Sequence, residues 1–277
     1  MLFRIIALDI DGTLTNSRKT ISLRTKSKLI TFQKNGGRIV LASGRPTMGV
    51  APYAADLRLR EFGGYIMPYN GGCIVDCRTG NSLYRNYLSA SYIPQICSVI
   101  KDYPVGINTY SDGKILVGHK LNKYAELEAR INRMPLEYIT DFEGTVTEDV
   151  PKCLLSGEPE VISELEQVLS RRFHGELGIF RSEPFFLEIV PVSVDKAQSL
   201  ERLLRAINIS TDECIAFGDG FNDITMIRYA GLGVAMDNAS DTVKSAADYV
   251  TASNDEDGIA CLLSEMGRSV FPSLAML

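Results

Sequence analysis

Two aspartates separated by one residue, Asp9 and Asp11, end a continuous apolar run in the segment IIALDIDGTLT. Gly12 and Thr13 follow them at once. Carboxylates at this spacing serve as metal ligands, as nucleophiles, or as proton donors and acceptors. Asp and Gly after a strand are also ordinary turn residues, so the pair alone leaves a chemical and a purely structural interpretation open.

Two further segments, LASGR and IAFGDGFND, also place polar residues directly after an apolar run. The residues they contribute are Ser43, Gly44, Arg45, Asp219, Asn222 and Asp223. Carboxylates crowded together repel one another unless a hard cation neutralises them. A few oxygen ligands suit Mg²⁺, which completes its shell with water and phosphate oxygens. Taken together, the three segments predict a Mg²⁺ and phosphoryl site.

The elements that must position these residues alternate between strand and helix. Continuous apolar runs at 3–9 and 38–43 predict strands buried on both faces. Between them, Ser22 is the expected N-cap of a helix that ends before Gly36, and a further helix is expected after the second run, over about 47–60. Strand, helix and strand in succession imply parallel strands with right-handed crossovers. Ligands bind beyond the carboxyl ends of such strands, so we expect the polar segments to meet at one edge.

The pattern changes in the middle of the chain. Residues 85–188 mix short strand candidates with two helices, near 123–133 and 161–172, which is typical of an α+β module with an antiparallel sheet. The sequence therefore predicts an α/β fold with a doubly wound, Rossmann-like parallel-sheet core at 1–84 and 189–277. We expect an α+β domain, residues 85–188, to be inserted in this core. The C-terminal GRSVFPSLAML shows no clear element.

Composition excludes several classes of protein. The net charge is -5 and no basic block is present, so we expect no nucleic-acid partner. No run approaches the roughly 20 apolar residues of a membrane span. The N-terminal apolar run is short and ends in acids, unlike a signal peptide, and the six cysteines lack CxxC spacing. We expect a cytoplasmic protein with reduced thiols, a monomer or a weak homo-oligomer.

Several catalytic templates are missing from the sequence. No cysteine has an arginine six positions later, and neither of the two histidines lies in a catalytic or zinc-binding pattern. The P-loop and G-x-S-x-G motifs are absent, and the glycine-rich segments lack the third glycine of a dinucleotide site. Carboxylate chemistry is what this sequence supports.

At these residues the chain resembles the haloacid dehalogenase (HAD) superfamily of phosphohydrolases, and within it the Cof-type subfamily. The motifs that carry the resemblance are DIDGT, SGR, the lysine of VDKAQSL, and GDGFND. GVAMDNASDTVKSAADYVT is similar to the C-terminal signature of the family, although Asp237 stands where relatives often have glycine. The resemblance spans nearly the whole chain and implies a cap of the C2B type.

The resemblance also implies roles for individual residues. Asp9 is the expected nucleophile and Asp11 the expected general acid and base, with Ser43 and Lys196 completing the catalytic set. The metal ligands would be Asp9, the backbone carbonyl of Asp11, Asp219 and Asp223. Residues expected to bind or orient the substrate are Thr13, Gly44, Arg45 and Asn222. In the cap, FRSEPFFLEI is a candidate substrate-facing segment, because Glu183 and Glu188 bracket an aromatic pair.

These expectations define one leading function and two alternatives. The leading function is a Mg²⁺-dependent phosphatase that hydrolyses a small phosphorylated metabolite, such as a sugar phosphate, through an aspartyl-phosphate. A sugar phosphomutase or other phosphotransferase would use the same aspartate pair. A metabolite sensor without activity is the third possibility, because a fold alone does not dictate a function. A pure binder would not need Asp11 as an acid.

Overall fold

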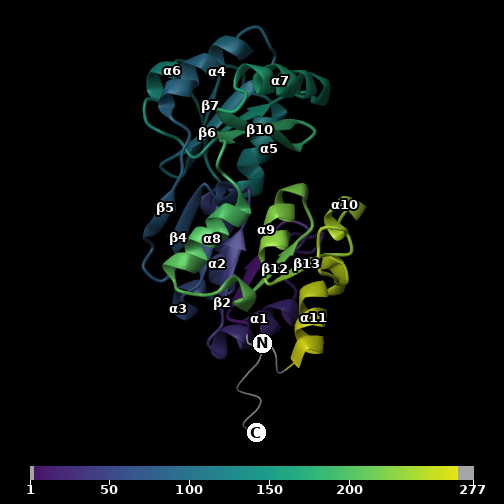
Figure 1. Ribbon diagram of the computed structural model, residues 1–277. Helices are drawn as coiled ribbons and strands as arrows, with labels where there is room; N and C mark the ends of the chain where they lie inside the picture. The colour runs from purple at the N-terminus through teal and green to yellow at the C-terminus, as the bar shows by residue number, and fades with distance from the viewer. Residues whose placement is uncertain (1–2, 268–277) are drawn as a thin grey trace. The chain divides into compact units, whose positions relative to one another are not determined.

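The computed structural model describes residues 3–267 and divides into two compact units (Figure 1). The first unit is formed by the chain up to Tyr84 and from Asp195 onward, and the second is Arg85–Val194. The C-terminal segment from Arg268, in which the sequence shows no clear element, lies outside the described residues. The six cysteines are all within the described part and are free thiols.

Within the described residues, the first unit is built on an eight-stranded sheet. In sheet order its strands are β14 (Tyr249–Val250), β13 (Leu232–Ala235), β12 (Cys214–Gly218), β1 (Ile5–Leu8), β2 (Arg38–Ala42), β3 (Tyr65–Met67), β4 (Cys73–Asp76) and β5 (Ser82–Arg85). The strands from β14 to β3 are parallel, and β4 is antiparallel to β3. β1 lies between β12 and β2, with Ala7 opposite both Ala216 and Val40.

Helices cover both faces of this sheet. They are α1 (Leu23–Lys34), α2 (Thr47–Asp56), α3 (Leu59–Phe62), α8 (Lys196–Ala206), α9 (Ile224–Tyr229), α10 (Asp241–Lys244) and α11 (Gly258–Met266). Successive strand residues point to opposite faces. Ile6 and Leu8 of β1 pack with α1 and α11, whereas Ile5 and Ala7 pack with α8 and α9 (Figure 1). The predicted doubly wound α/β fold is confirmed.

In the first unit, the predicted start of the first helix is confirmed, whereas the next predicted helix is interrupted. Ser22 is the N-cap of α1, and its hydroxyl oxygen accepts a hydrogen bond of 3.0 Å from the backbone N–H of Thr25. The expected helix over 47–60 is interrupted, because Arg58 adopts a left-handed conformation (φ 57°) between α2 and α3. A residue with positive φ cannot continue a right-handed helix.

The second unit contains a separate six-stranded sheet among the described residues. In sheet order its strands are β10 (Leu177–Glu183), β11 (Phe186–Pro191), β9 (Cys153–Ser156), β6 (Gly106–Ser111), β7 (Lys114–Gly118) and β8 (Leu136–Tyr138). Its helices are α4 (Ile93–Ile100), α5 (Lys123–Asn132), α6 (Phe142–Thr145) and α7 (Pro159–Arg172). The helices expected near 123–133 and 161–172 correspond to α5 and α7.

Two details of the second unit differ from expectation. The sheet is mixed rather than antiparallel, because β7 and β8 run parallel and are joined through α5. A parallel pair needs such a crossover, whereas a hairpin can join only antiparallel strands. The second unit also extends to Val194, beyond the boundary expected after residue 188. The reason is that β11 continues to Pro191, which lies opposite Leu177 of β10.

Candidate active site

The ends of three neighbouring parallel strands meet in the first unit. Asp9 follows β1, and its backbone N–H donates to the carbonyl of Phe217 in β12 at 3.1 Å. Ser43 follows β2, and its backbone N–H donates to the carbonyl of Met67 in β3 at 3.0 Å. Asp219 directly follows β12. The sheet thus brings the three polar segments to one edge, as their positions after apolar runs predict.

A glycine allows the loop after β1 to approach Asp219. Gly12 has φ +85°, and a Cβ added to it would lie 2.2 Å from Asp219 Oδ2. Any larger residue would therefore clash with the carboxylate as well as strain the backbone. The next residue, Thr13, is buried and its hydroxyl donates to Asp219 Oδ1 at 2.6 Å. In this structure Thr13 orients a carboxylate, and its expected contact with substrate stays a prediction.

A buried lysine joins two of the acids. Lys196 is the first residue of α8, and its Nζ lies 2.7 Å from Asp9 Oδ1 and 2.6 Å from Asp223 Oδ1. Its side chain is 0% exposed. Burial alone would lower the pKa of Lys196, but Asp223 and Asp9 outweigh it and raise that pKa above its ordinary value. Lys196 is therefore a fixed positive charge.

The carboxylates of Asp9, Asp219 and Asp223 form a cluster that fits a divalent cation. One oxygen from each lies within 4.8 Å of the other two. Burial, and next the charge of Asp223, raise the pKa of Asp9 well above its ordinary value, with Lys196 acting against them. Burial also raises the pKa of Asp219 to about 6, although the hydrogen bond from Thr13 opposes this. Lys196 alone does not neutralise the cluster, and an oxygen-only donor set suits a hard cation.

Asp223 is held more tightly than the other two acids. It is 0% exposed, and while Oδ1 accepts from Lys196, its Oδ2 accepts from the backbone N–H groups of Asp219 and Gly220 at 3.1 and 2.9 Å. These bonds fold the GDGFND loop around the carboxylate. Asp223 thereby fixes the position of Asp219 as well as that of Lys196.

Asp11 faces a different set of partners. Its Oδ2 accepts from Arg45 Nε at 2.6 Å, and its Oδ1 accepts from Arg45 Nη2 and Lys19 Nζ, both at 2.8 Å. Burial would raise the pKa of Asp11, but the bonds from Arg45 and then Lys19 prevail and lower it to about 2. Asp11 is thus held ionised, which suits a base. Its expected function as a proton donor stays a prediction and requires these cations to release it.

The remaining predicted substrate residues surround an asparagine that sequence reasoning missed. Asn70 is buried and follows β3, and its Oδ1 accepts from Asn222 Nδ2 at 2.9 Å. A Cβ added to Gly44 would lie 3.3 Å from the Asn70 amide. The hydroxyl oxygen of Ser43 accepts from the backbone N–H of Arg45 at 3.2 Å. The strand-end signal that marks Asp9 also marks Asn70, in the segment MPYN.

Asn238 is a second missed residue. It follows β13 by three positions, and its Nδ2 donates to the carbonyl of Gly12 at 2.9 Å and to Asp219 Oδ2 at 3.4 Å. Its neighbour Asp237, the departure from the family pattern, pairs with Lys244 at 2.8 Å and is 61% exposed. Asn238 therefore supports the acidic cluster directly, whereas the unusual Asp237 does not contact it.

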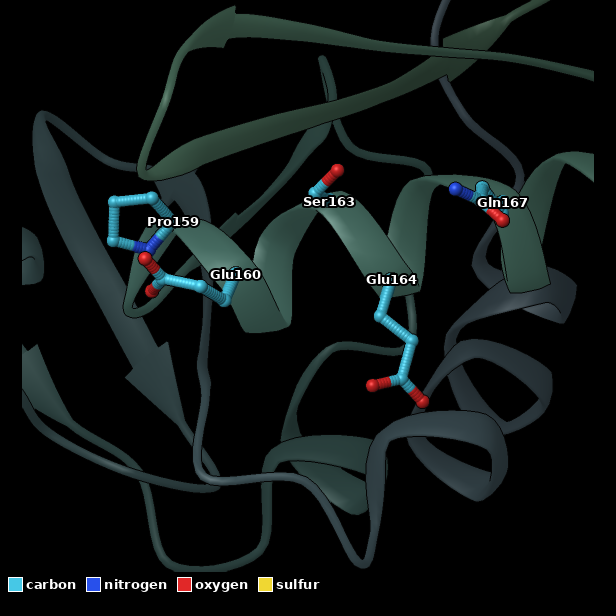
Figure 2. A pocket seen from close by; sticks show the side chains of 5 residues that line it. All are labelled: Pro159, Glu160, Ser163, Glu164 and Gln167. Carbon is cyan, nitrogen blue, oxygen red and sulfur yellow. The ribbon is translucent and has the colours of Figure 1, made fainter.

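The second unit offers two weaker candidates for a site. A depression along α7 is lined by Pro159, Glu160, Ser163, Glu164 and Gln167, and Figure 2 shows these side chains along successive turns of the helix. Its two glutamates would repel a phosphate dianion. The second candidate is the segment FRSEPFFLEI. In it Glu188 is buried and forms an ion pair of 2.7 Å with Lys152, and the ring of Phe185 stacks on that of Tyr124 with 4.8 Å between the ring centroids. Its contact with substrate stays a prediction.

A parallel-sheet core that gathers carboxylates at its strand ends suits the hydrolysis of phosphate esters. The haloacid dehalogenase-like hydrolase family matches residues 6–263. A haloacid dehalogenase-like hydrolase from Bacteroides thetaiotaomicron is 44% identical, with 95% of this chain and 99% of that one covered and a TM-score of 0.91. The chain belongs to this family and is a phosphoric monoester hydrolase of the Cof-type subclass IIB.

Two further relatives carry names that state an activity. The Bacillus subtilis 5-amino-6-(5-phospho-D-ribitylamino)uracil phosphatase YcsE is 30% identical over 93% of both chains. The subclass IIB sugar phosphatase BT4131 is 26% identical, with 95% of this chain and 99% of that one covered and a TM-score of 0.81. Separately, no helix within residues 3–267 is long and apolar enough to cross a membrane.

Opposite pH trends are expected with and without a divalent cation. The folded-state pKa of Asp219 lies above its ordinary value, so the cation-free protein should lose stability as pH rises through about 6. With Mg²⁺ in excess, protons and cation compete for the same carboxylates, so stability should rise over the same window. Thermal unfolding between about pH 4 and pH 7, in chelator or in Mg²⁺, measures both trends, because the contribution of Asp219 changes mainly between its ordinary pKa and about 6. Asp219→Asn should weaken both trends without removing them, because the raised pKa of Asp9 still contributes. Parallel trends in the two buffers would contradict the assignment.

Proposed function

We propose that this phosphatase depends on Mg²⁺ and hydrolyses a small phosphorylated metabolite through an aspartyl-phosphate on Asp9. The observation that carries the proposal is the meeting of Asp9, Asp219 and Asp223 around the buried Lys196. This arrangement holds a nucleophile, a fixed cation and an oxygen donor set at one strand edge.

The ligands proposed for Mg²⁺ are the side chains of Asp9 and Asp219 and the backbone carbonyl of Asp11. Asp223, whose oxygens accept from Lys196 and from two backbone N–H groups, would back these ligands. A bound Mg²⁺ would keep the carboxylates ionised and neutralise charge on the phosphoryl oxygens. Asn238 donates to Asp219 Oδ2 at 3.4 Å, and the absence of a side chain on Gly12 leaves room for that carboxylate.

In the first chemical step, a carboxylate oxygen of Asp9 attacks phosphorus while the bond to the leaving oxygen breaks. Asp11, once it is released from Arg45 and Lys19 and protonated, gives a proton to that leaving oxygen. In the second step, Asp11 takes a proton from the water that attacks the aspartyl-phosphate, and Asp9 is regenerated. Lys196 balances negative charge throughout, because phosphoryl transfer is accelerated chiefly by positioning and by electrostatic stabilisation. Ser43, Thr13, Gly44 and Asn222 are proposed to orient the phosphoryl group.

The proposed substrate is a small phosphate ester, with a sugar phosphate as the first candidate. The names of YcsE and BT4131 support this class, because both describe phosphatases of small phosphorylated compounds. We further propose that the second unit is a cap that selects the leaving group. A site that must exclude water and discriminate between leaving groups benefits from such a module.

A panel of phosphorylated sugars, nucleotides and pyridoxal phosphate, assayed with Mg²⁺ for phosphate release, tests the proposal. We expect release from one or more sugar phosphates and its loss in chelator. An isomerised sugar phosphate without net release would instead identify a phosphomutase. Release that is unaffected by chelator would contradict the Mg²⁺ assignment. Preference for a nucleotide or for pyridoxal phosphate would contradict the sugar phosphate assignment alone.

A further inference from the structure

Three successive residues after β3 adopt left-handed backbone conformations. Tyr69 and Asn70 both have φ 55°, and Gly71 has φ 92°. Glycine adopts such conformations readily and asparagine tolerates them, whereas they strain a bulky residue such as tyrosine. Tyr69 and Asn70 are 6% and 5% exposed, so the strain lies inside the protein and not in a surface loop. Strained backbone that its surroundings maintain is concentrated at functional sites.

Hydrogen bonds fix the backbone of this segment to two parts of the candidate site. The backbone N–H of Asn70 donates to the carbonyl of Ser43 at 2.8 Å. The carbonyl of the next residue, Gly71, accepts from the hydroxyl of Ser199 at 2.6 Å. Ser199 lies in the first turn of α8, the helix that begins at Lys196. Asn70 is therefore held by the loop that carries Ser43 and by the helix that carries Lys196.

The side-chain amide of Asn70 is oriented by two neighbours. Its Oδ1 accepts from Asn222 Nδ2 at 2.9 Å. A Cβ added to Gly44 would lie 3.3 Å from both Nδ2 and Oδ1 of Asn70, so the amide lies close against the backbone of that glycine. Because Asn222 fixes Oδ1, the direction of Nδ2 is fixed as well. Within residues 3–267, no group accepts a hydrogen bond from Asn70 Nδ2.

The surroundings of Asn70 indicate what its Nδ2 binds. A donor in a nearly buried side chain that lacks a partner in the chain is usually satisfied by a ligand or by an ordered water. The groups next to the amide belong to Ser43, Gly44 and Asn222, the residues proposed above to orient the phosphoryl group. A phosphoryl oxygen is negatively charged, so it accepts a stronger hydrogen bond than a neutral oxygen does. A phosphoryl oxygen therefore suits this donor best.

We propose that Asn70 is a further phosphoryl-binding residue, and that its Nδ2 donates to a non-bridging oxygen of the phosphoryl group. The inference rests on the phosphoryl site proposed above. The asparagine amide does not titrate, so it adds an uncharged donor to a site whose other groups are mostly charged. A donor of fixed direction restrains the phosphoryl group while Asp9 attacks, and such positioning is a main source of catalysis in phosphoryl transfer.

Two substitutions at Asn70 distinguish phosphate binding from a purely structural role. Asn70→Gly suits the left-handed backbone and removes the amide. Asn70→Asp keeps an oxygen that accepts from Asn222 and tolerates the same backbone, but it places a negative charge beside the phosphoryl group. We expect kcat/KM and the affinity for inorganic phosphate to fall roughly tenfold in Asn70→Gly. In Asn70→Asp both should fall by about a hundredfold or more, because like charges repel. If Asn70 only supported the turn, Asn70→Asp would be the milder change.

The test measures phosphate release from p-nitrophenyl phosphate and calorimetric binding of inorganic phosphate, with Mg²⁺ at about pH 8, where the added carboxyl group is ionised. The thermal unfolding midpoint checks that each variant is folded. Asn208→Gly and Asn208→Asp are the matched controls, because Asn208 is exposed and has φ 54°, and they should leave both values unchanged.

Unchanged phosphate affinity in Asn70→Gly would overturn the inference, because it would show that Nδ2 binds only water. A smaller loss in Asn70→Asp than in Asn70→Gly would overturn it as well. An unaltered protein that binds phosphate but releases none from any ester would overturn the proposed function, and the phosphate affinities would then decide the inference by themselves.

Discussion

Asp9→Asn is expected to lower phosphatase turnover by about ten-thousandfold or more, because an amide oxygen is a poor nucleophile toward phosphorus. Folding should be retained. The pKa of Asp9 is already raised by burial and by Asp223, so a neutral side chain is tolerated at this position. Asp223 would still partner Lys196 at 2.6 Å. Phosphate release under saturating Mg²⁺, together with the thermal unfolding midpoint, measures both parts of the prediction.

Asp56→Asn provides the matched control for this substitution. This substitution removes the same negative charge at an exposed site, where Asp56 pairs with Lys26. It should leave turnover and stability nearly unchanged, since exposed pairs contribute little. Appreciable hydrolysis by Asp9→Asn would exclude Asp9 as the nucleophile. Unfolding of that variant would show instead that the buried pair with Lys196 is essential for the fold.

Lys196→Met is expected to abolish turnover and to destabilise the first unit by about 3–5 kcal/mol. The substitution leaves Asp9 and Asp223 buried without their shared cation, which is far more costly than losing a surface pair. Lys196→Arg should not restore activity, because a larger planar guanidinium does not fit a side chain position that is 0% exposed. Urea unfolding at neutral pH in chelator measures the loss of stability.

A second substitution separates the structural and catalytic parts of this prediction. Adding Asp223→Asn to Lys196→Met removes one of the two unpaired charges, so part of the lost stability should return while activity stays absent. Lys26→Met is the control for replacing a lysine by methionine, and it should change the free energy of unfolding by less than about 1 kcal/mol. Wild-type stability in Lys196→Met would contradict the view that Lys196 is a fixed buried charge.

The meeting of Asp9, Ser43 and Asp219 could be predicted because it follows from a short chain of rules. Each residue comes directly after a continuous apolar run, and such runs separated by helices form neighbouring parallel strands. The carboxyl ends of parallel strands share one edge. The same rule, extended to the three residues after a strand, would have placed Asn70 at this edge, since it lies three positions after the end of β3.

The partners of each side chain could not be predicted in this way. Asp11 is two positions from Asp9 yet binds Arg45 and Lys19, while Thr13 turns back to Asp219. These pairings depend on the left-handed backbone conformations of Gly12 and Lys19, and both conformations are set by loop geometry. In the second unit, β7 and β8 pair in parallel, with α5 in the crossover between them, whereas the sequence pattern indicated an antiparallel sheet.

The sequence by itself determined the α/β class, the strand ends that carry the acids and the family to which the chain belongs. Buried strands and family motifs can be identified from short stretches of neighbouring residues, which is why these features did not require the structure. Only the tertiary structure decided which charges neutralise which. In the folded chain Lys196 forms ion pairs with Asp9 and Asp223, whereas Asp11 forms ion pairs with Arg45 and Lys19. The physical reason is that an ion pair depends on distance in space, and residues such as Asp9 and Lys196 are brought together only when helix α8 packs on the sheet.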